Sequence, residues 1–221
     1  MTLVIAHRGA SVDAPENSLK AFRLARQLGA DGVELDVHAS VEGIPLVHHD
    51  AVINDMPIAS RTVDELRRSP TPSGQPIPTL AEALETLVDL AVYIEVKTLS
   101  PAFDDALFAV LDNGPIPSSY QIHSFDHRIV VRLRALRDDF GYGVLAASRP
   151  VSPLHAIQEV GARTLWQHES MVDRPLVEAA HAQGYEVCAW TVDDEARIRG
   201  LVEFGVDAIC TNRPDRAKEL V

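Results

Sequence analysis

The sequence predicts an α/β protein whose strands close into a (β/α)8 TIM barrel, and three observations lead to this prediction. Short apolar runs alternate with amphipathic stretches along the whole chain, a pattern typical of parallel strands joined by helical crossovers. Eight such runs can be counted, which favours a closed barrel over an open doubly wound sheet, the alternative if a run is misassigned. The length of 221 residues fits a barrel, which typically has about 250 residues but can be built from about 200.

The predicted strands are the short apolar runs, bounded by glycine, proline or polar residues. They cover residues 4–6, 33–37, 92–96, 120–123, 143–146, 164–166, 186–190 and 208–210. One further run, residues 46–48, follows the turn residues Gly43 and Pro45. We expect it to form a side-strand in a hairpin, outside the eight.

The predicted helices are the amphipathic stretches between these runs. Asn17 or Ser18 can cap the first helix, Gly29 ends it, and Thr79 can cap the second. The helices are expected at residues 19–28, 79–88, 101–111, 126–136, 153–160, 175–183, 194–204 and 214–221.

Residues 51–78 interrupt this alternation. The stretch contains Pro57, Pro70, Pro72, Pro76 and Pro78, and such a density of proline favours loop structure. We expect a short insertion with one helical turn near residues 63–67, within a single domain that covers residues 1–221.

Composition and charge limit the kinds of molecule that the protein is expected to bind. The formal net charge of −12 leaves no broad basic surface, which argues against nucleic acid as a partner. The amino terminus lacks a basic region followed by a signal-length apolar run, and no apolar stretch approaches the roughly 20 residues of a membrane span. We therefore expect a cytoplasmic protein, a monomer or homodimer, with Cys188 and Cys210 as buried reduced thiols.

Acidic residues occur inside the predicted strands, where unpaired charge is costly. Glu34 and Asp36 are two residues apart in one strand and therefore point to the same side, and Glu95 lies in the next. Three carboxylates from neighbouring strands form an oxygen-only set that suits a hard divalent cation, Mg²⁺ or Ca²⁺, rather than zinc. The alternative is that Glu34 and Glu95 are neutralised in ion pairs with Arg8 and Lys97.

Basic residues lie close to these carboxylates in the predicted fold. His7 and Arg8 close the first strand, Lys97 follows Glu95 by two residues, and His49 precedes Asp50, which can orient its ring. A lone histidine is more often a satisfied polar residue than a catalyst. Two histidines with an arginine and a lysine at the carboxyl end of a barrel, beside a metal site, nevertheless favour attack on a phosphodiester.

An ordered set of motifs resembles the glycerophosphodiester phosphodiesterase family. It opens with His7-Arg8-Gly9, Pro15-Glu16-Asn17-Ser18 and the stretch from Gly29 through Glu34-Leu35-Asp36 to Val37. It continues with residues 43–50, Ile77-Pro78-Thr79-Leu80, Ile94-Glu95-Val96-Lys97, Ser124-Phe125-Asp126, Trp190-Thr191-Val192-Asp193 and residues 205–209. Each piece is weak alone, but the ordered set spans nearly the whole chain and is highly specific.

The resemblance implies a (β/α)8 barrel that hydrolyses glycerophosphodiesters to glycerol 3-phosphate and an alcohol. It implies His7 and His49 as the acid–base pair, and Glu34, Asp36 and Glu95 as ligands of the divalent metal. It also implies that Arg8 and Lys97 bind the phosphate and that Trp190 lines the substrate site, although an isolated tryptophan is more often part of a core.

Two departures from the family pattern stand out. Residues 51–78 are short and lack the family's usual leucine–arginine–threonine run after the His-Asp pair, which leaves the preferred alcohol open. Asn212 stands where an aspartate is usual, and we expect that position to matter for loop structure.

Two other functions remain open from the sequence. A phospholipase-type barrel that cleaves lysophospholipids would use a similar set of residues, and a longer apolar lip on the insertion would favour it. A catalytically inactive binding barrel would show the loss of a histidine or a metal carboxylate, and none is lost.

Overall fold

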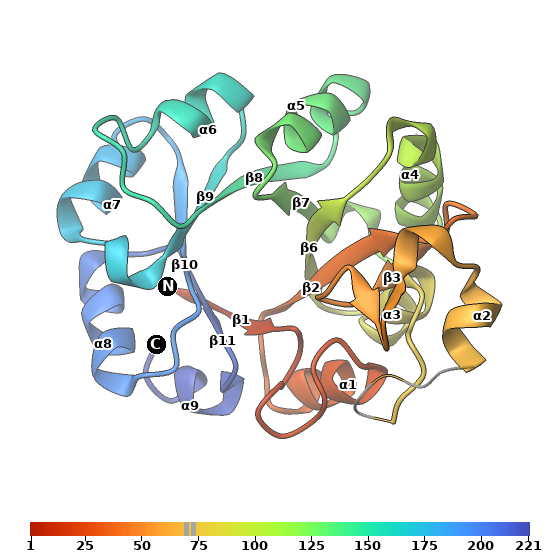
Figure 1. Cartoon of the computed structure of the whole chain (residues 1–221). Helices are drawn as coiled ribbons and strands as arrows, with labels where there is room; N and C mark the ends of the chain where they lie inside the picture. Colours follow the sequence, from red (N-terminus) through yellow and green to blue (C-terminus); the bar gives the residue numbers. More distant parts are fainter. Residues whose placement is uncertain (69–70, 72–73) are drawn as a thin grey trace.

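The computed structural model describes residues 1–68, 71 and 74–221. Within them, eight parallel strands form a closed ring surrounded by helices (Figure 1). The strands, in chain order, are β1 (Leu3–His7), β2 (Gly32–Ala39), β6 (Ala91–Thr98), β7 (Tyr120–Ser124), β8 (Gly141–Ala146), β9 (Thr164–His168), β10 (Glu186–Trp190) and β11 (Ala208–Thr211).

Pairing of the first and last strands closes the barrel. Leu3 of β1 lies opposite Ala208 of β11, while Ile5 of β1 lies opposite Gly32 of β2. Strand β1 therefore has a partner on both sides, which an edge strand of an open sheet would not have. The predicted closed (β/α)8 barrel is confirmed.

The helices follow the predicted order. They are α1 (Leu19–Gln27), α3 (Leu80–Thr86), η2 (Pro101–Phe103), α4 (Asp104–Asp112), η3 (Pro117–Ser119), α5 (His127–Leu136), α6 (His155–Val160), η4 (Glu169–Met171), α7 (Arg174–His181), α8 (Glu195–Phe204) and α9 (Pro214–Lys218). Among the described residues, no helix is both long and apolar enough to cross a membrane.

Capping explains where the helices begin and end. Ser18, not Asn17, caps α1 by accepting a hydrogen bond from the Ala21 amide. Thr79 and Glu82 form a reciprocal capping box on α3.

The prediction that the last helix runs to residue 221 is wrong, because α9 ends at Lys218 and the following amides bond three residues back rather than four.

Two apolar layers hold the barrel. The larger layer lies between the strands and the helices, and its members include Phe22, Leu35 and Ile94. The smaller layer fills the barrel interior around Trp166 and includes Tyr93, Cys188 and Cys210. Both cysteines are buried and free, as predicted.

The described residues between 51 and 78 form a small cap with its own apolar cluster. Strand β3 (Pro45–Val47) pairs antiparallel with β2, as predicted for the side-strand. The cap then contains β4 (Val52–Ile53), β5 (Met56–Pro57), η1 (Ile58–Ser60) and α2 (Val63–Arg68), the last at the predicted helical turn. Five apolar residues of the cap pack together with Leu46 of β3: Ile53, Ile58, Val63, Leu66 and Ile77.

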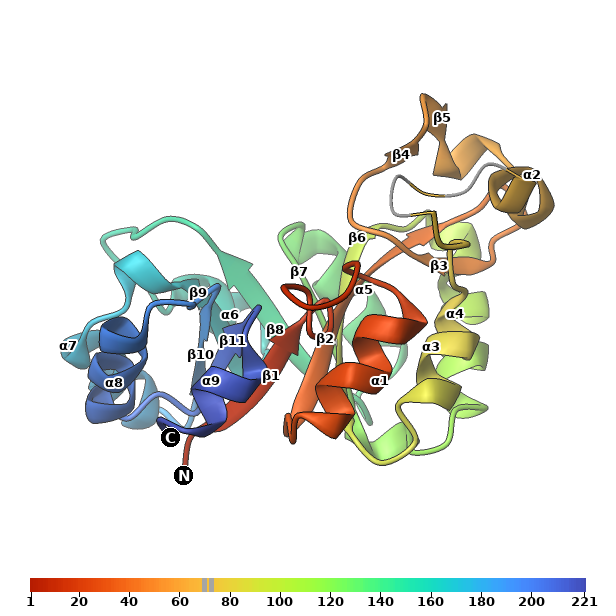
Figure 2. The same ribbon diagram turned by 90° about the horizontal axis from the view of Figure 1, so that it is seen from below.

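The cap rises above the carboxyl ends of the barrel strands (Figure 2). Its β4–β5 hairpin was not predicted and turns at Asn54 and Asp55, both with positive φ. Pro70 and Pro72 of the predicted loop lie outside the described residues. The position of the cap matters because (β/α)8 enzymes carry their active sites at this end of the barrel.

Gly143 tests how tightly the barrel interior is packed. An added Cβ would lie 2.8 Å from Cδ1 of Trp166 and 3.1 Å from the carbonyl oxygen of Thr164. We expect Gly143→Ala to lower the free energy of unfolding by about 1–3 kcal/mol, the usual cost of overpacking. Gly200→Ala is the matched control in helix α8, where a Cβ meets nothing within 4 Å and alanine favours the helix. Urea unfolding of both variants checks this, and equal effects would contradict it.

Candidate active site

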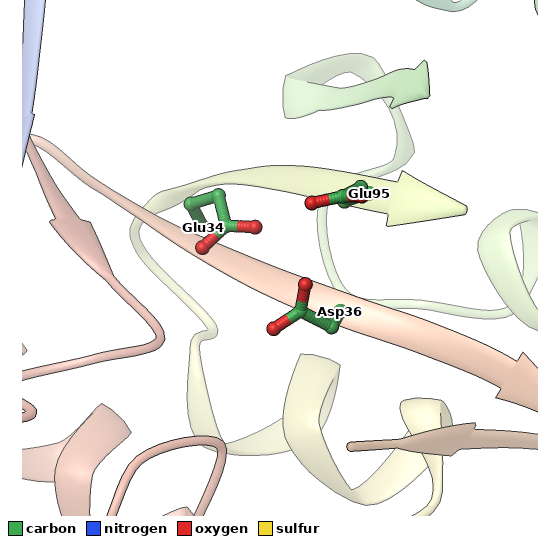
Figure 3. A group of neighbouring side chains, drawn as sticks. All are labelled: Glu34, Asp36 and Glu95. Carbon is green, nitrogen blue, oxygen red and sulfur yellow. The ribbon is translucent and has the colours of Figure 1, made fainter. Parts of the chain in front are cut away.

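Three predicted metal ligands meet at the carboxyl end of neighbouring strands. Asp36 of β2 is directly opposite Glu95 of β6 in the strand register. One carboxylate oxygen from each of Glu34, Asp36 and Glu95 lies within 4.8 Å of the others. Figure 3 shows the three side chains converging on one space from the two strands. All three are buried.

Two cations and an amide surround these carboxylates. Arg8 Nε lies 3.0 Å from Asp36 Oδ2, and Lys97 Nζ lies 2.8 Å from Glu95 Oε1 and 3.3 Å from Asp36 Oδ1. Asn17 Nδ2 donates a 2.7 Å hydrogen bond to Asp36 Oδ2. Of the two ion pairs considered as the alternative to a metal site, the Lys97–Glu95 pair is present, whereas the Arg8 guanidinium pairs with Asp36 and Glu16 rather than with Glu34. Glu34 instead accepts the backbone N–H of Arg8 at 3.1 Å.

The carboxylates outnumber the cations, and their pKa values reflect it. Burial, reinforced by the charge of Asp36, raises the pKa of Glu34 well above its usual value and that of Glu95 to about 7. Burial also acts to raise the pKa of Asp36, but Arg8, Lys97 and the Asn17 hydrogen bond lower it overall. A divalent cation among these oxygens would offset their mutual repulsion. The residues present therefore fit such an ion.

The turn after β1 places Arg8 beside this cluster. Arg8 has a φ of 57°, in the left-handed region that residues other than glycine rarely adopt, and Gly9 follows with a φ of 82°. A Cβ at position 9 would lie 2.7 Å from Ala21 in helix α1. Glycine is required there, because only a bare backbone lets the turn pack against the helix.

His7 is held by a residue that the sequence interpretation assigned only to loop structure. His7 Nδ1 lies 2.7 Å from Asn212 Oδ1, while Asn212 Nδ2 donates to Asp193 Oδ2 at 2.6 Å. The amide oxygen must therefore face the ring, so Nδ1 carries the proton and Nε2 is left with its lone pair. Burial and the neighbouring Arg8 lower the pKa of His7. Asn212 therefore fixes the orientation of the His7 ring in addition to its loop contacts with Asp193, which agree with the expected structural role.

His49 follows β3 and faces the same end of the barrel. Its Nδ1 lies 2.9 Å from Asp50 Oδ1, the contact anticipated from their adjacency. His38, which the sequence interpretation did not single out, donates from Nε2 to the carbonyl oxygen of His49 at 3.1 Å. Thr98 lies 3.1 Å from the other nitrogen of His38. His38 therefore joins the backbone of His49 to the barrel.

A cavity of about 90 Å³ brings the predicted residues together. All eight predicted site residues except Asp36 line it: His7, Arg8, Glu34, His49, Glu95, Lys97 and Trp190. The Trp190 ring contacts Phe125 edge to face, with centroids 5.4 Å apart. A neighbouring hollow of about 290 Å³ shares His49 and extends between the turn at Pro15–Ser18 and the cap.

His123 is a further cavity residue outside the predicted set. It lies one residue before the end of β7, opposite Glu95, and its ring stacks on Trp166 with centroids 4.3 Å apart and an interplanar angle of 11°. Burial lowers the pKa of His123 to about 3. Its position at the end of a strand, like that of His7, was the available sequence signal.

The fold and the site together define the class: a (β/α)8 enzyme whose cavity gathers acids, histidines and cations at the carboxyl ends of its strands. The family model for "Glycerophosphoryl diester phosphodiesterase family" matches residues 7–216. The chain belongs to this family.

Known proteins resemble the chain over its full length. A glycerophosphodiester phosphodiesterase of Caldanaerobacter subterraneus is 30% identical over 237 residues, covering 100% of this chain and 98% of that protein. An Oleispira antarctica phosphodiesterase, solved in complex with the product sn-glycerol-3-phosphate, superposes with a TM-score of 0.91 at 28% identity and covers 100% and 96% of the two chains. A glycerophosphodiester phosphodiesterase from Agrobacterium tumefaciens has a TM-score of 0.86 at 28% identity, covering 99% and 100%.

The contact between His7 and Asn212 predicts a pH effect. Asn212→Asp places a carboxylate against Nδ1–H, which stabilises the protonated ring. We expect the pKa of His7 to rise by about 1 unit or more, the usual effect of an adjacent opposite charge. Histidine ring resonances followed by NMR against pH measure the change. Ser11→Ala, which removes another donor to Asn212 Oδ1 without adding charge, is the control, and an unchanged or lower pKa in Asn212→Asp would contradict the assignment.

Proposed function

We propose that this chain hydrolyses glycerophosphodiesters to glycerol 3-phosphate and an alcohol. The observation that carries the proposal is that His7, His49, an arginine and a lysine line one cavity beside a buried cluster of carboxylates. The name of the Caldanaerobacter relative and the product bound by the Oleispira enzyme support the same substrate class.

The acidic cluster is proposed to hold one divalent metal ion, Mg²⁺ or Ca²⁺. Glu34, Asp36 and Glu95 provide only oxygen donors, close together and buried, and such a set suits hard cations. Asp36 Oδ1 is buried, and its nearest cation is Lys97 Nζ at 3.3 Å. When bound, the ion would draw charge from the phosphate oxygens and lower the barrier to displacement.

Arg8 and Lys97 are proposed to bind the phosphate. Their side chains are 16% and 18% exposed and line the cavity, so both remain within reach of an anion. Arg8 presents a planar fork suited to two phosphate oxygens, while Lys97 acts as a point charge. Their partly buried positions strengthen this attraction relative to bulk water. Trp190 is proposed to pack against the substrate.

The two histidines are proposed to divide the proton transfers. His7 acts as the base, because its lowered pKa keeps the ring neutral and its Nδ1 bond to Asn212 leaves Nε2 free to accept a proton. His49 lies in the loop after β3, whereas His7 ends β1, and the His49 ring is oriented by Asp50. His49 acts as the acid on the other side of the phosphorus. In-line displacement requires two groups placed in this way.

The first nucleophile is proposed to be the glycerol hydroxyl next to the phosphate, since intramolecular attack gains from proximity. His7 takes the proton of this hydroxyl as its oxygen bonds to phosphorus, and His49 protonates the alcohol oxygen as the bond between phosphorus and that oxygen breaks. Water then opens the cyclic phosphate with the two roles reversed. The alcohol leaves toward the adjoining 290 Å³ hollow, whose open position favours low selectivity among small alcohols.

Product analysis tests this function. We expect glycerophosphocholine, glycerophosphoethanolamine and glycerophosphoglycerol each to yield glycerol 3-phosphate, with added Mg²⁺ or Ca²⁺ restoring activity after EDTA treatment. Glu95→Gln, which keeps the shape but removes a charge, should abolish both turnover and thermal stabilisation by the metal. Full activity of the chelated wild-type protein, or cleavage of lysophosphatidylcholine alone, would refute the proposal.

Leaving-group chemistry tests the histidine roles. Each of His7→Ala and His49→Ala should lower kcat on an alkyl diester by at least about 10²-fold, the lower range for acid–base catalysis. A 4-nitrophenyl ester of glycerol phosphate has a leaving group that needs no proton, so His49→Ala should recover most of its loss on that ester while His7→Ala should not. Equal losses of both variants on both esters would contradict the division.

A further inference from the structure

Two hydrogen-bonding atoms on residues that line the cavity have no partner among the described residues. They are Nδ1 of His123 and Nε1 of Trp190, and both atoms are buried. Both residues line the cavity together with Lys97 and Glu95. Buried polar groups in folded proteins almost always have a hydrogen-bond partner, so whatever fills this cavity is expected to supply one.

His123 lies at the floor of the cavity, the side nearest Trp166, and packing restricts its ring. Its ring stacks on Trp166, which also borders a separate cavity of about 310 Å³ at the opposite end of the barrel. Trp166 is fully buried, and Gly143 leaves room for it. The imidazole therefore lies on a rigid aromatic platform that separates the active end from the lower end.

Burial and charge indicate what His123 can bind. His123 is 1% exposed, so its ring stays neutral and offers one donor and one acceptor. Arg8 and Lys97, nearer the solvent, already provide the positive charge that a phosphate needs. A neutral ring deeper in the cavity is suited instead to a hydroxyl group, which can also both donate and accept.

We propose that His123 is a specificity-determining residue that hydrogen-bonds the glycerol hydroxyl farthest from the phosphorus, and so selects diesters with an intact glycerol. This inference rests on the proposed function. With the phosphate at Arg8 and Lys97, the polyol extends toward the floor, where His123 supplies the bond and Trp190 Nε1–H provides a second donor. The role differs from those of His7 and His49, because His123 exchanges no proton with the reacting atoms.

The test compares two substrates that differ in one hydroxyl. They are glycerophosphoethanolamine and its 2-hydroxypropyl analogue, which lacks the terminal hydroxyl but keeps the one next to the phosphate. The wild-type enzyme should prefer the glycerol substrate in kcat/KM by at least about tenfold, equivalent to about 1.4 kcal/mol. His123→Phe keeps a flat ring on Trp166 and removes both nitrogens, so it should reduce this preference to about one by slowing only the glycerol substrate.

Two further variants separate recognition from folding. His123→Asn places an amide near the position of Nδ1 and should restore part of the preference. Tyr93→Phe is the control, because Tyr93 contacts the same Trp166 ring but lines the lower cavity, and it should leave the preference unchanged. An equal loss on both substrates in His123→Phe and His123→Asn would overturn the inference, since it would indicate a structural role or a contact with water. If wild-type enzyme cleaved neither substrate, the proposed function itself would be wrong.

Discussion

The burial of three carboxylates within a few ångströms of one another is the constraint on which the rest of the site depends. Glu34, Asp36 and Glu95 repel one another in a space that water scarcely reaches, so the fold must supply positive charge around them. Arg8 and Lys97 provide part of it, and both are held next to Asp36. The left-handed backbone of Arg8 and the Asn17 hydrogen bond follow from the same need.

The barrel meets this need through strand register and interior packing. Parallel pairing sets Asp36 beside Glu95, and Glu95 beside His123, at the carboxyl ends of their strands. Beneath them Trp166 fills the interior and contacts both His123 and Tyr93. The apolar residues around Trp166 separate the carboxylates from the cavity at the opposite end of the barrel. The carboxylates and His123 therefore stand on packed strands rather than on loops.

The sequence predicted the elements whose pattern is local. Alternating apolar runs located the eight strands, and the spacing of Glu34 and Asp36 placed them on one side of a strand. Contacts between distant residues were not predictable in this way, because neither periodicity nor spacing encodes them. Asn212 reaches His7 only because β11 closes against β1, and His38 holds His49 through a strand reversal. The β4–β5 hairpin was missed because the surrounding prolines favoured a loop.

The most direct test asks whether burying the three carboxylates together lowers the stability of the fold, and whether a cation restores that stability. It measures the thermal unfolding of the wild-type protein and of Glu34→Gln, each with and without Mg²⁺ or Ca²⁺. The pKa of Glu34 is raised in the folded state. At a pH above the pKa of this group in the unfolded chain, its ionisation therefore lowers the stability of the folded protein. We expect the metal to raise the Tm of the wild-type protein. We also expect metal-free Glu34→Gln to be more stable than the metal-free wild type, and the variant to gain little from the metal. A less stable metal-free variant, or a full metal response in Glu34→Gln, would contradict the account.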